Sequence, residues 1–311
     1  MKYKEKTLLL DNHVEISPNK IIGKGHSFCH HGELLQGVFY CENLQEYVYG
    51  LTTLKCNLFS SRAMFIPNNT GKINITPTVN KKSKKAAELI IKYLNKNVGG
   101  DIFIQSNIIP KLGFGSSTAD ILSTMLAISD LYEVELTEDV LAKLAVKSEI
   151  ASDSIMYQND ILFAQKKGVV IEEFKKKLPT MIVLGFDEAP ENNGFDTVSM
   201  KPLQYSTQEK AEFQKLRLLL SEAAEKQDVN LLGEVATRSA LVNQKYYPKK
   251  NLEKIIQIKD EKKASGVQIS HSGDLVGLIW DPTTPFLHER IEESKQKLKN
   301  INIKSFWIFE T

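Results

Sequence analysis

Residues 110–120 read PKLGFGSSTAD, and this stretch determines how the rest of the chain is interpreted. It follows an apolar, β-branched run at residues 101–109 and precedes apolar residues that recur at helical spacing between Ile121 and Tyr132. Glycines let a backbone approach a ligand closely, and a helix N-terminus offers free amides and a favourable dipole to an anion. The order of strand, glycine loop and helix therefore predicts a site suited to a polyphosphate.

The loop belongs to none of the common nucleotide-binding types. No GxxxxGK precedes a Ser or Thr, and Thr118 stands where a dinucleotide fingerprint has its third glycine. The HRD and DFG signatures of protein kinases are also missing. Small residues at a helix start also form an ordinary cap, in which the hydroxyl of Ser116 or Ser117 accepts hydrogen bonds from the first backbone amides. Taken alone, the loop leaves both interpretations open.

Length and pattern together predict two domains. The 311 residues, 42% of them hydrophobic, suit two modest domains that share a cleft. We expect a domain at residues 1–172, which holds the glycine loop, and a second at residues 173–311. Strands and helices alternate without βαβ regularity, which favours an α+β fold. The clearest predicted strands are 47–53, 56–65, 72–76, 101–109, 181–186, 275–280 and 303–309, and the clearest helices are 86–94, 140–150, 208–226 and 229–243.

Composition excludes several classes of protein. The formal net charge is +2, which gives no argument for a nucleic-acid partner or an anionic membrane. The three cysteines, Cys29, Cys41 and Cys56, lack CxxC spacing, which fits a reducing cytoplasm better than a disulfide framework or a structural zinc site. The apolar triplet at residues 8–10 is far too short for a signal peptide or a membrane span. We expect a cytoplasmic protein, either a monomer or a homodimer.

Several motifs together resemble one family. The glycine loop is similar to the second motif of the GHMP kinases, and its SSTAD ending is similar to that of the L-threonine kinases of cobalamin biosynthesis. HGELLQG at residues 31–37 resembles their first motif, and SEIASDSIMY at 148–157 resembles a further segment. GVQISHSGDLVGLIWD at 266–281 resembles the third motif in an HSG variant. The resemblance implies an N-terminal ribosomal-protein-S5-like sandwich and a ferredoxin-like C-terminal domain, with ATP bound between them and Mg²⁺ as cofactor.

The resemblance also implies which residues bind ATP. Phosphate contacts are expected from two turns, and the second of these turns could equally be a plain hairpin. The expected residues are Lys111, Gly113, Phe114, Gly115, Ser116, Ser117 and Thr118 in the first turn, and Ser270, His271, Ser272 and Gly273 in the second, where the histidine would donate a hydrogen bond.

Three residues are expected to carry the chemistry. Ser116 and Glu149 are the implied magnesium ligands, and Asp153 is the candidate to orient or deprotonate the acceptor hydroxyl. Glu149 could instead be a solvated carboxylate at a helix end, and Asp153 an Asx-turn cap. The two carboxylates could also exchange roles.

The acceptor is expected to contact the first motif. Glu33 and Gln36 offer a carboxylate and an amide oxygen, which suit the ammonium group of an amino acid, unless they only pair with each other at a strand end. His31, Asp153 and Asn243 are further candidates, although Asn243 could simply serve helix packing. The chain departs from the family in GHSFCHHGEL at residues 25–34, where the family has proline and a small residue. The spacing of these histidines matches no common zinc site.

The sequence thus predicts a kinase that transfers the γ-phosphate of ATP to the hydroxyl of a small amino-acid-like acceptor. L-Threonine is the first expectation, followed by L-serine or a derivative. The alternatives are a GHMP kinase for another small alcohol and a non-catalytic sensor that keeps the nucleotide-binding fold.

Overall fold

The computed structural model describes residues 20–189 and 204–311. The apolar triplet at residues 8–10, on which the expectation of no membrane anchor partly rests, lies outside them. Within the described residues, no helix has both the length and the hydrophobicity needed to cross a bilayer.

Helices and strands are mixed along the chain, so the predicted α+β class is confirmed. The helices are α1 (Lys81–Tyr93), α2 (Ser116–Leu131), α3 (Glu138–Glu149), α4 (Thr207–Lys226), α5 (Val229–Asn243), α6 (Leu252–Glu261) and α7 (Leu287–Lys299). The strands are β1 (Gly23–Cys41), β2 (Glu46–Asn68), β3 (Ile73–Thr76), β4 (Gly99–Ser106), β5 (Ile161–Ala164), β6 (Val169–Glu173), β7 (Ile182–Asp187), β8 (Gly266–Ile269), β9 (Leu275–Trp280) and β10 (Phe306–Glu310).

Two long antiparallel strands, β1 and β2, form the spine of the molecule. They pair from Cys41 and Glu46 at the hairpin to Gly23 and Phe65, with register shifts around His30 and Glu33. The sequence predicts two shorter strands where the structure has the single strand β2. The break expected near Lys55 does not occur because that residue is still paired with His30 on β1. The irregular register lies in the HHGEL stretch, and it is this part of β1 that enters the candidate site.

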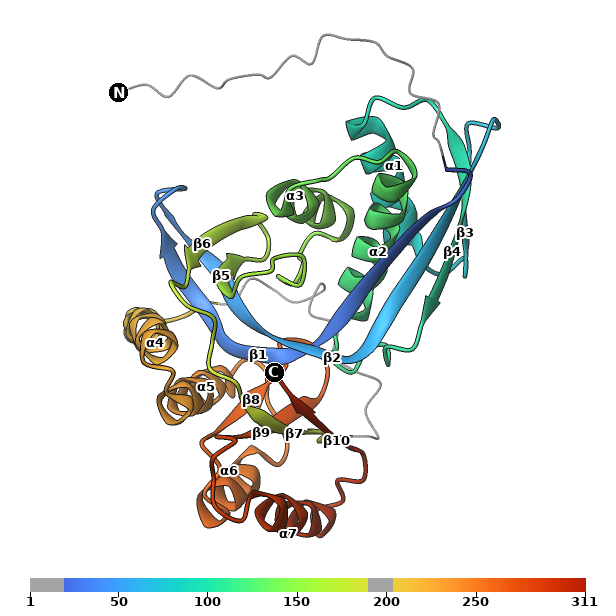
Figure 1. Ribbon diagram of the computed structural model, residues 1–311. Helices are drawn as coiled ribbons and strands as arrows, with labels where there is room; N and C mark the ends of the chain where they lie inside the picture. Colours follow the sequence, from blue (N-terminus) through green and yellow to red (C-terminus); the bar gives the residue numbers. More distant parts are fainter. Residues whose placement is uncertain (1–19, 190–203) are drawn as a thin grey trace.

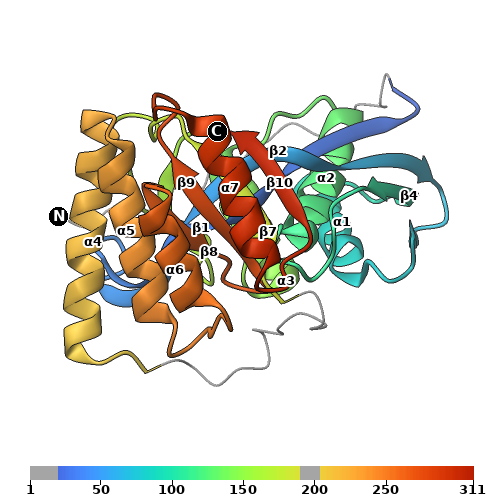
Figure 2. The ribbon, with the colours of Figure 1, turned by 90° about the horizontal axis from the view of Figure 1, so that it is seen from below.

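The strands of the described residues form one curled sheet, in the order β10-β7-β9-β8-β1-β2-β4-β3, with β5 and β6 attached to β2. Figure 1 shows α1, α2 and α3 on one part of this sheet and α6 and α7 covering its far end. Figure 2 shows α4 and α5 beside each other next to β1 and β8. Since β1 pairs with both β2 and β8, the sheet runs through the predicted boundary at 172, and the division into two domains stays a prediction.

Each group of helices buries its own apolar cluster. One cluster joins α1, α2 and α3 to β3 and β4, with Phe65 and Ile90 fully buried. A second joins α6 and α7 to β7, β8 and β9 around Trp280. A third lies between β1, α4 and α5, and it includes Phe39, Phe213 and also Phe114 of the glycine loop. The loop is therefore fixed to the core that joins the two halves of the sheet.

Helix α2 lies directly against β1, and two glycines make this approach feasible. A Cβ atom on Gly23 would lie 1.9 Å from the carbonyl oxygen of Ala127, and one on Gly25 would lie 1.9 Å from that of Ser123. Both oxygens belong to the helix backbone, which cannot shift as easily as a flexible side chain. The N-terminus of α2 is thereby held at a fixed height above the sheet.

We predict that Gly25→Ala destabilises the protein by about 3 kcal/mol, because the added methyl group must push α2 away from β1. Chemical denaturation measures this change in the free energy of unfolding. Lys24→Ala is the matched control, because the side chain of Lys24 is exposed and its contact with Asp130 uses the backbone N–H. Equal stability of the two variants would contradict the prediction.

Candidate active site

The glycine loop ends in a helix whose N-terminus has no side-chain cap. The N-cap residue is Gly115 with φ of 69°, and no side-chain hydrogen bond caps the first turn of α2. The ordinary serine cap that the sequence left open is therefore absent. The hydroxyls of Ser117 and Thr118 point instead to a carboxylate, since they donate to the two oxygens of Glu149 at 2.7 Å and 2.8 Å. The first amides of the helix remain available to an anion.

The two small-residue turns that the sequence singled out pack against each other. The backbone amides of Asp274 and Leu275 donate to the Leu112 carbonyl at 3.1 Å and 3.2 Å. A Cβ atom on Gly113 would lie 2.5 Å from the Ser272 carbonyl oxygen, and one on Gly273 would lie 2.3 Å from Leu112 backbone. Both glycines have positive φ, of 111° and 75°. The glycine loop and the turn at residues 270–273 therefore form one continuous wall.

A cavity of about 330 Å³ opens beside this wall. Most of the predicted phosphate and catalytic residues line it. The lining residues are Tyr49, Lys82, Pro110, Lys111, Gly113, Phe114, Gly115, Ser116, Ser117, Thr118, Glu149, Ile150, Ala151, Asp153, Gln165, Lys166, Tyr247, His271 and Ser272. In the second turn, Ser270 and Gly273 do not line the cavity.

Glu149 is a buried carboxylate, with a relative exposure of 5%, and not a solvated one. Besides the two hydroxyls, it has Lys82 Nζ at 3.6 Å from Oε2. Burial raises its pKa, the nearby Asp153 raises it further, and the hydrogen bonds and Lys82 oppose this rise. A cation at this position would relieve the cost of the buried charge.

Asp153 lies against a histidine that the sequence left without a role. His30 is 3% exposed, and its Nε2 atom is 3.0 Å from Asp153 Oδ2. The angle at His30 Nε2 does not meet the requirement for a hydrogen bond, so the contact with Asp153 is mainly electrostatic. Burial alone would lower the pKa of His30, but Asp153 outweighs it and raises the pKa to about 9. The imidazolium in turn holds the pKa of Asp153 below its usual value, against the effect of burial.

His30 also explains why Gly115 is a glycine. A Cβ atom at Gly115 would lie 2.3 Å from His30 Nε2 and 3.0 Å from Asp153 Oδ2. The backbone N–H of His30 donates to the Phe114 carbonyl at 3.2 Å, which fixes the strand to the loop. Thr118 Oγ1 also lies 3.1 Å from Asp153 Oδ2, so its single proton is shared between Glu149 and Asp153. The ion pair, the loop and the start of α2 are thus assembled as one unit.

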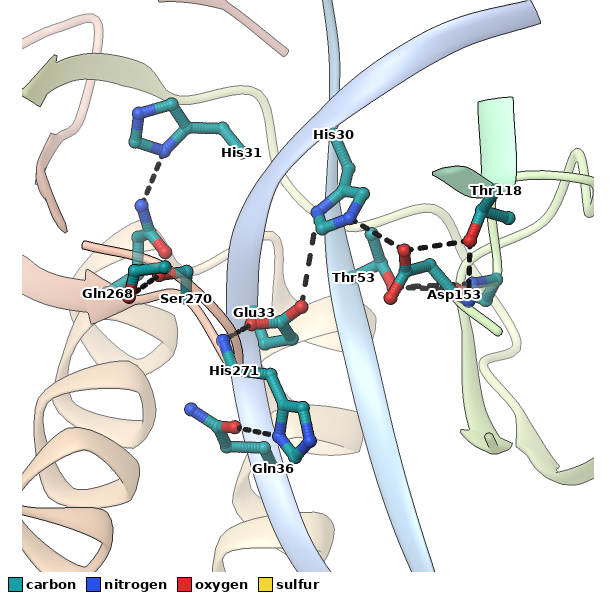
Figure 3. A network of polar contacts seen from close by, with 12 residues as sticks. His30, His31, Glu33, Gln36, Thr53, Thr118, Asp153, Gln268, Ser270 and His271 are labelled. Carbon is teal, nitrogen blue, oxygen red and sulfur yellow. Dashed lines mark hydrogen bonds and ion pairs between the residues drawn. The ribbon is translucent and has the colours of Figure 1, made fainter. Parts of the chain in front are cut away.

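Glu33 and Gln36 do not line the cavity. Figure 3 shows both residues in contact with His271, Glu33 above it and Gln36 below it in this view. The His271 N–H donates to Glu33 Oε2 at 2.5 Å, and its ring Nδ1 lies 2.9 Å from Gln36 Oε1. An amide oxygen only accepts, so Nδ1 carries the ring proton and Nε2 is left with a lone pair. Burial lowers the pKa of His271 to about 4, so the ring is neutral and an acceptor at Nε2, contrary to the donor expected from the sequence.

Two of the residues expected to bind the acceptor lie elsewhere. His31 is fully buried, with Nδ1 2.5 Å from Gln268 Nε2 and its ring against Phe114 and Phe309, and Figure 3 shows it turned away from Asp153. Asn243 Nδ2 donates to the carbonyls of Gln36 and Ser239 at 2.9 Å and 2.8 Å. Its Oδ1 accepts from the Tyr205 hydroxyl, so Asn243 serves packing, the alternative that the sequence left open.

Sequence reasoning missed several residues of the site. Lys82 belongs to the run NKKSKK, which is typical of a solvated helix start, but it lines the cavity. Lys166 and Tyr247 also line it. Lys249 lies under the turn at 270–273, where its buried amine donates to the Gly273 carbonyl and lies 3.4 Å from Ser270 Oγ. The histidine run GHSFCHHGEL carried a signal, as a departure from the family pattern.

The donors around Glu149 suit a hard cation. Its carboxylate and the hydroxyls of Ser116 and Ser117 are oxygen ligands of the kind that Mg²⁺ prefers. Another group, His30, Glu33 and Asp153, has ligand atoms within 4.8 Å of one another. Its histidine has a pKa raised to about 9 by the nearby Asp153, so a metal ion bound there would have to displace a proton. Of these two groups, the oxygen set around Glu149 fits magnesium better.

The family comparison falls on the same elements. Residues 81–157 match the family described as GHMP kinases N terminal domain. The match runs from α1 through the glycine loop and α3 to the segment that carries Asp153. The GHMP kinase resemblance inferred from the sequence is confirmed.

Within the GHMP kinases, two relatives carry the same name. The chain is 31% identical over 183 residues to an L-threonine kinase of Citrobacter freundii, covering 58% of this chain and 62% of the relative. It is 30% identical over 179 residues to an L-threonine kinase of Salmonella typhimurium, covering 57% of this chain and 59% of that relative. The matched segment thus spans about three fifths of each relative's length.

Solved GHMP kinase structures share the fold over nearly the whole chain. A homoserine kinase from Cytophaga hutchinsonii has a TM-score of 0.70 at 14% identity, covering 96% of both chains. A mevalonate kinase of L. major, in complex with R-mevalonate, has a TM-score of 0.61 at 15% identity, covering 94% of this chain and 98% of that one. At such identities the likeness establishes the fold of the GHMP kinases, and nothing about the acceptor.

We predict that His30→Gln destabilises the protein in a pH-dependent way. The folded-state pKa of about 9 lies above the ordinary value of 6.5, so the ion pair stabilises fully below pH 6.5 and its contribution is lost as the pH rises through 9. The destabilisation should shrink by about 2–3 kcal/mol between pH 6 and pH 9.5. Urea denaturation at both pH values measures it, with His26→Gln, exposed on the same strand, as control. A destabilisation that is the same at both pH values would refute the ion pair.

Proposed function

We propose that the protein transfers the γ-phosphoryl group of ATP to the hydroxyl of a small amino-acid-like acceptor, with L-threonine first and L-serine or a derivative next. One observation carries the proposal: a single cavity brings together an uncapped helix N-terminus, a buried carboxylate bonded to two hydroxyls, and an ionised aspartate. These are the parts that phosphoryl transfer requires, since it depends mainly on positioning and charge stabilisation.

In this proposal Asp153 acts on the acceptor hydroxyl. Its carboxylate is kept ionised by His30 and is oriented by the Thr118 hydroxyl. An ionised carboxylate beside the acceptor can orient the hydroxyl and accept its proton as the new P–O bond forms. Because the imidazolium also weakens Asp153 as a base, orientation is the larger part of its role and proton acceptance occurs late.

The glycine loop supplies the phosphate site. The free amides at the start of α2 and the hydroxyl of Ser116 would bind the terminal phosphates, and Lys111 adds positive charge at the loop. Magnesium, when bound, neutralises charge on the phosphates. Glu149 would hold it together with Ser116 or Ser117, and both Thr118 and Lys82 keep the Glu149 carboxylate in place.

The amino-acid-like acceptor is supported by two independent facts. Both curated relatives are L-threonine kinases. The neutral ring of His271 offers a lone pair at Nε2 to the cavity, which suits an ammonium or hydroxyl hydrogen of the acceptor.

ADP release with Mg²⁺, ATP and a panel of hydroxy amino acids and plain alcohols tests the proposal. We expect turnover of L-threonine, a fall in kcat of roughly 10²- to 10⁴-fold for Asp153→Asn, and a loss of activity for Ser116→Ala. Asp260→Asn is the control, because Asp260 is exposed and does not line the cavity.

Other outcomes separate the alternatives. Turnover of a plain alcohol but of no amino acid would keep the kinase and discard the acceptor. ATP binding without turnover of any acceptor would favour the non-catalytic sensor. Asp153→Asn with undiminished kcat would remove Asp153 from the mechanism.

A further inference from the structure

An amino-acid acceptor brings a carboxylate into a cavity that already holds two acidic side chains. Glu149 and Asp153 both line the cavity, and Asp153 is ionised. A third negative charge at this distance is repelled unless a cation compensates it. A positive group of the cavity must therefore bind the carboxylate of the acceptor.

Among the described residues, the side chains that line the cavity include three lysines and no arginine. Lys82 is engaged with Glu149, its Nζ lying 3.6 Å from Oε2. Lys111 belongs to the glycine loop, with φ of 65°, beside the expected phosphates. His271 is neutral, since burial lowers its pKa to about 4. By elimination, Lys166 is the cation left for the acceptor.

The position of Lys166 is fixed by its turn. It lies between β5 and β6, where the amides of Lys167 and Gly168 both donate to the Ala164 carbonyl at 2.9 Å. The preceding Gln165 accepts from the Ser152 amide at 3.0 Å, which ties the turn to the residue next to Asp153. Lys166 therefore sits on the segment that is bonded directly to the Asp153 backbone region.

Among the described residues, the side chain of Lys166 contacts an aromatic ring and forms no ion pair with a carboxylate. Its Nζ lies 5.1 Å from the centre of the Tyr49 ring, a cation–π contact that restricts the flexible side chain. Within residues 20–189 and 204–311 it makes no ion pair. The adjacent Lys167, by contrast, is paired with Glu46 at 2.7 Å and does not line the cavity.

We propose that Lys166 binds the carboxylate of the acceptor and thereby selects amino acids over uncharged alcohols. This inference rests on the proposed function and names the determinant of its substrate class. The ammonium donors of Lys166 would meet the carboxylate, while Asp153 and the His271 lone pair face the hydroxyl and ammonium groups. In this arrangement the carboxylate, hydroxyl and ammonium groups of the acceptor contact a positive, a negative and a neutral side chain, namely Lys166, Asp153 and His271.

A matched pair of acceptors tests the proposal. L-Threonine and L-threoninamide share shape, hydroxyl and amine, and they differ in the negative charge of the carboxylate. We expect Lys166→Met to lower kcat/KM for L-threonine about tenfold, mainly through KM, and to leave kcat/KM for the amide within about twofold. The KM for ATP should not change. Lys167→Met, one residue along the same turn, should behave as wild type with both acceptors.

Each outcome decides the matter. An equal loss with both acceptors, or no loss with L-threonine, would overturn the role of Lys166 while leaving the kinase in place. A wild type that phosphorylates uncharged alcohols but no carboxylate-bearing acceptor would likewise overturn it. If the wild type turns over no acceptor, the proposed function fails, and this inference fails with it.

Discussion

The close packing of the glycine loop between β1 and the turn at residues 270–273 is the constraint on which the site depends. Three glycines, Gly113, Gly115 and Gly273, have positive φ, and a Cβ on any of them would enter a neighbouring segment. The loop must therefore touch His30 on one side and the second turn on the other. This packing brings residues more than 100 positions apart to one cavity, and it holds the start of α2 with its amides uncapped.

A second consequence of this packing is electrostatic. Glu33, Glu149 and Asp153 are brought close to one another in a poorly solvated region, where each charge is costly. The chain offsets the cost unequally. Asp153 lies 3.0 Å from the His30 ring, Glu149 accepts from two hydroxyls and lies 3.6 Å from Lys82, and Glu33 accepts one backbone N–H and lies 3.9 Å from the His30 ring. Accordingly burial raises the pKa of Glu33 to about 7, whereas that of Asp153 is held low. The environment also shifts the pKa values of Glu149 and Asp153 in opposite directions, which agrees with the different roles that we propose for them.

Local sequence patterns predicted most of the helices and strands and the phosphate half of the site. The bounds of α5 and β9 agree with prediction, because their apolar spacing is continuous and their ends are marked by polar residues. β2 was predicted as two strands, since a pattern of side chains cannot show that pairing with β1 persists across a register shift. Residues of the glycine loop were found because their chemistry is local. Lys166 and Tyr247 were not, because they reach the cavity only through tertiary packing.

The acceptor half of the site shows why a motif alone misassigned roles. Glu33 and Gln36 have the chemistry to bind an ammonium group, but both side chains reach His271 before they reach the cavity. Their effect on a ligand would therefore pass through His271, whose ring proton Gln36 places at Nδ1 and whose backbone N–H donates to Glu33. The same stretch contributes His30, whose charge acts through Asp153. The HHGELLQG segment therefore supports groups that line the cavity, and the acceptor contacts that we propose lie on other segments.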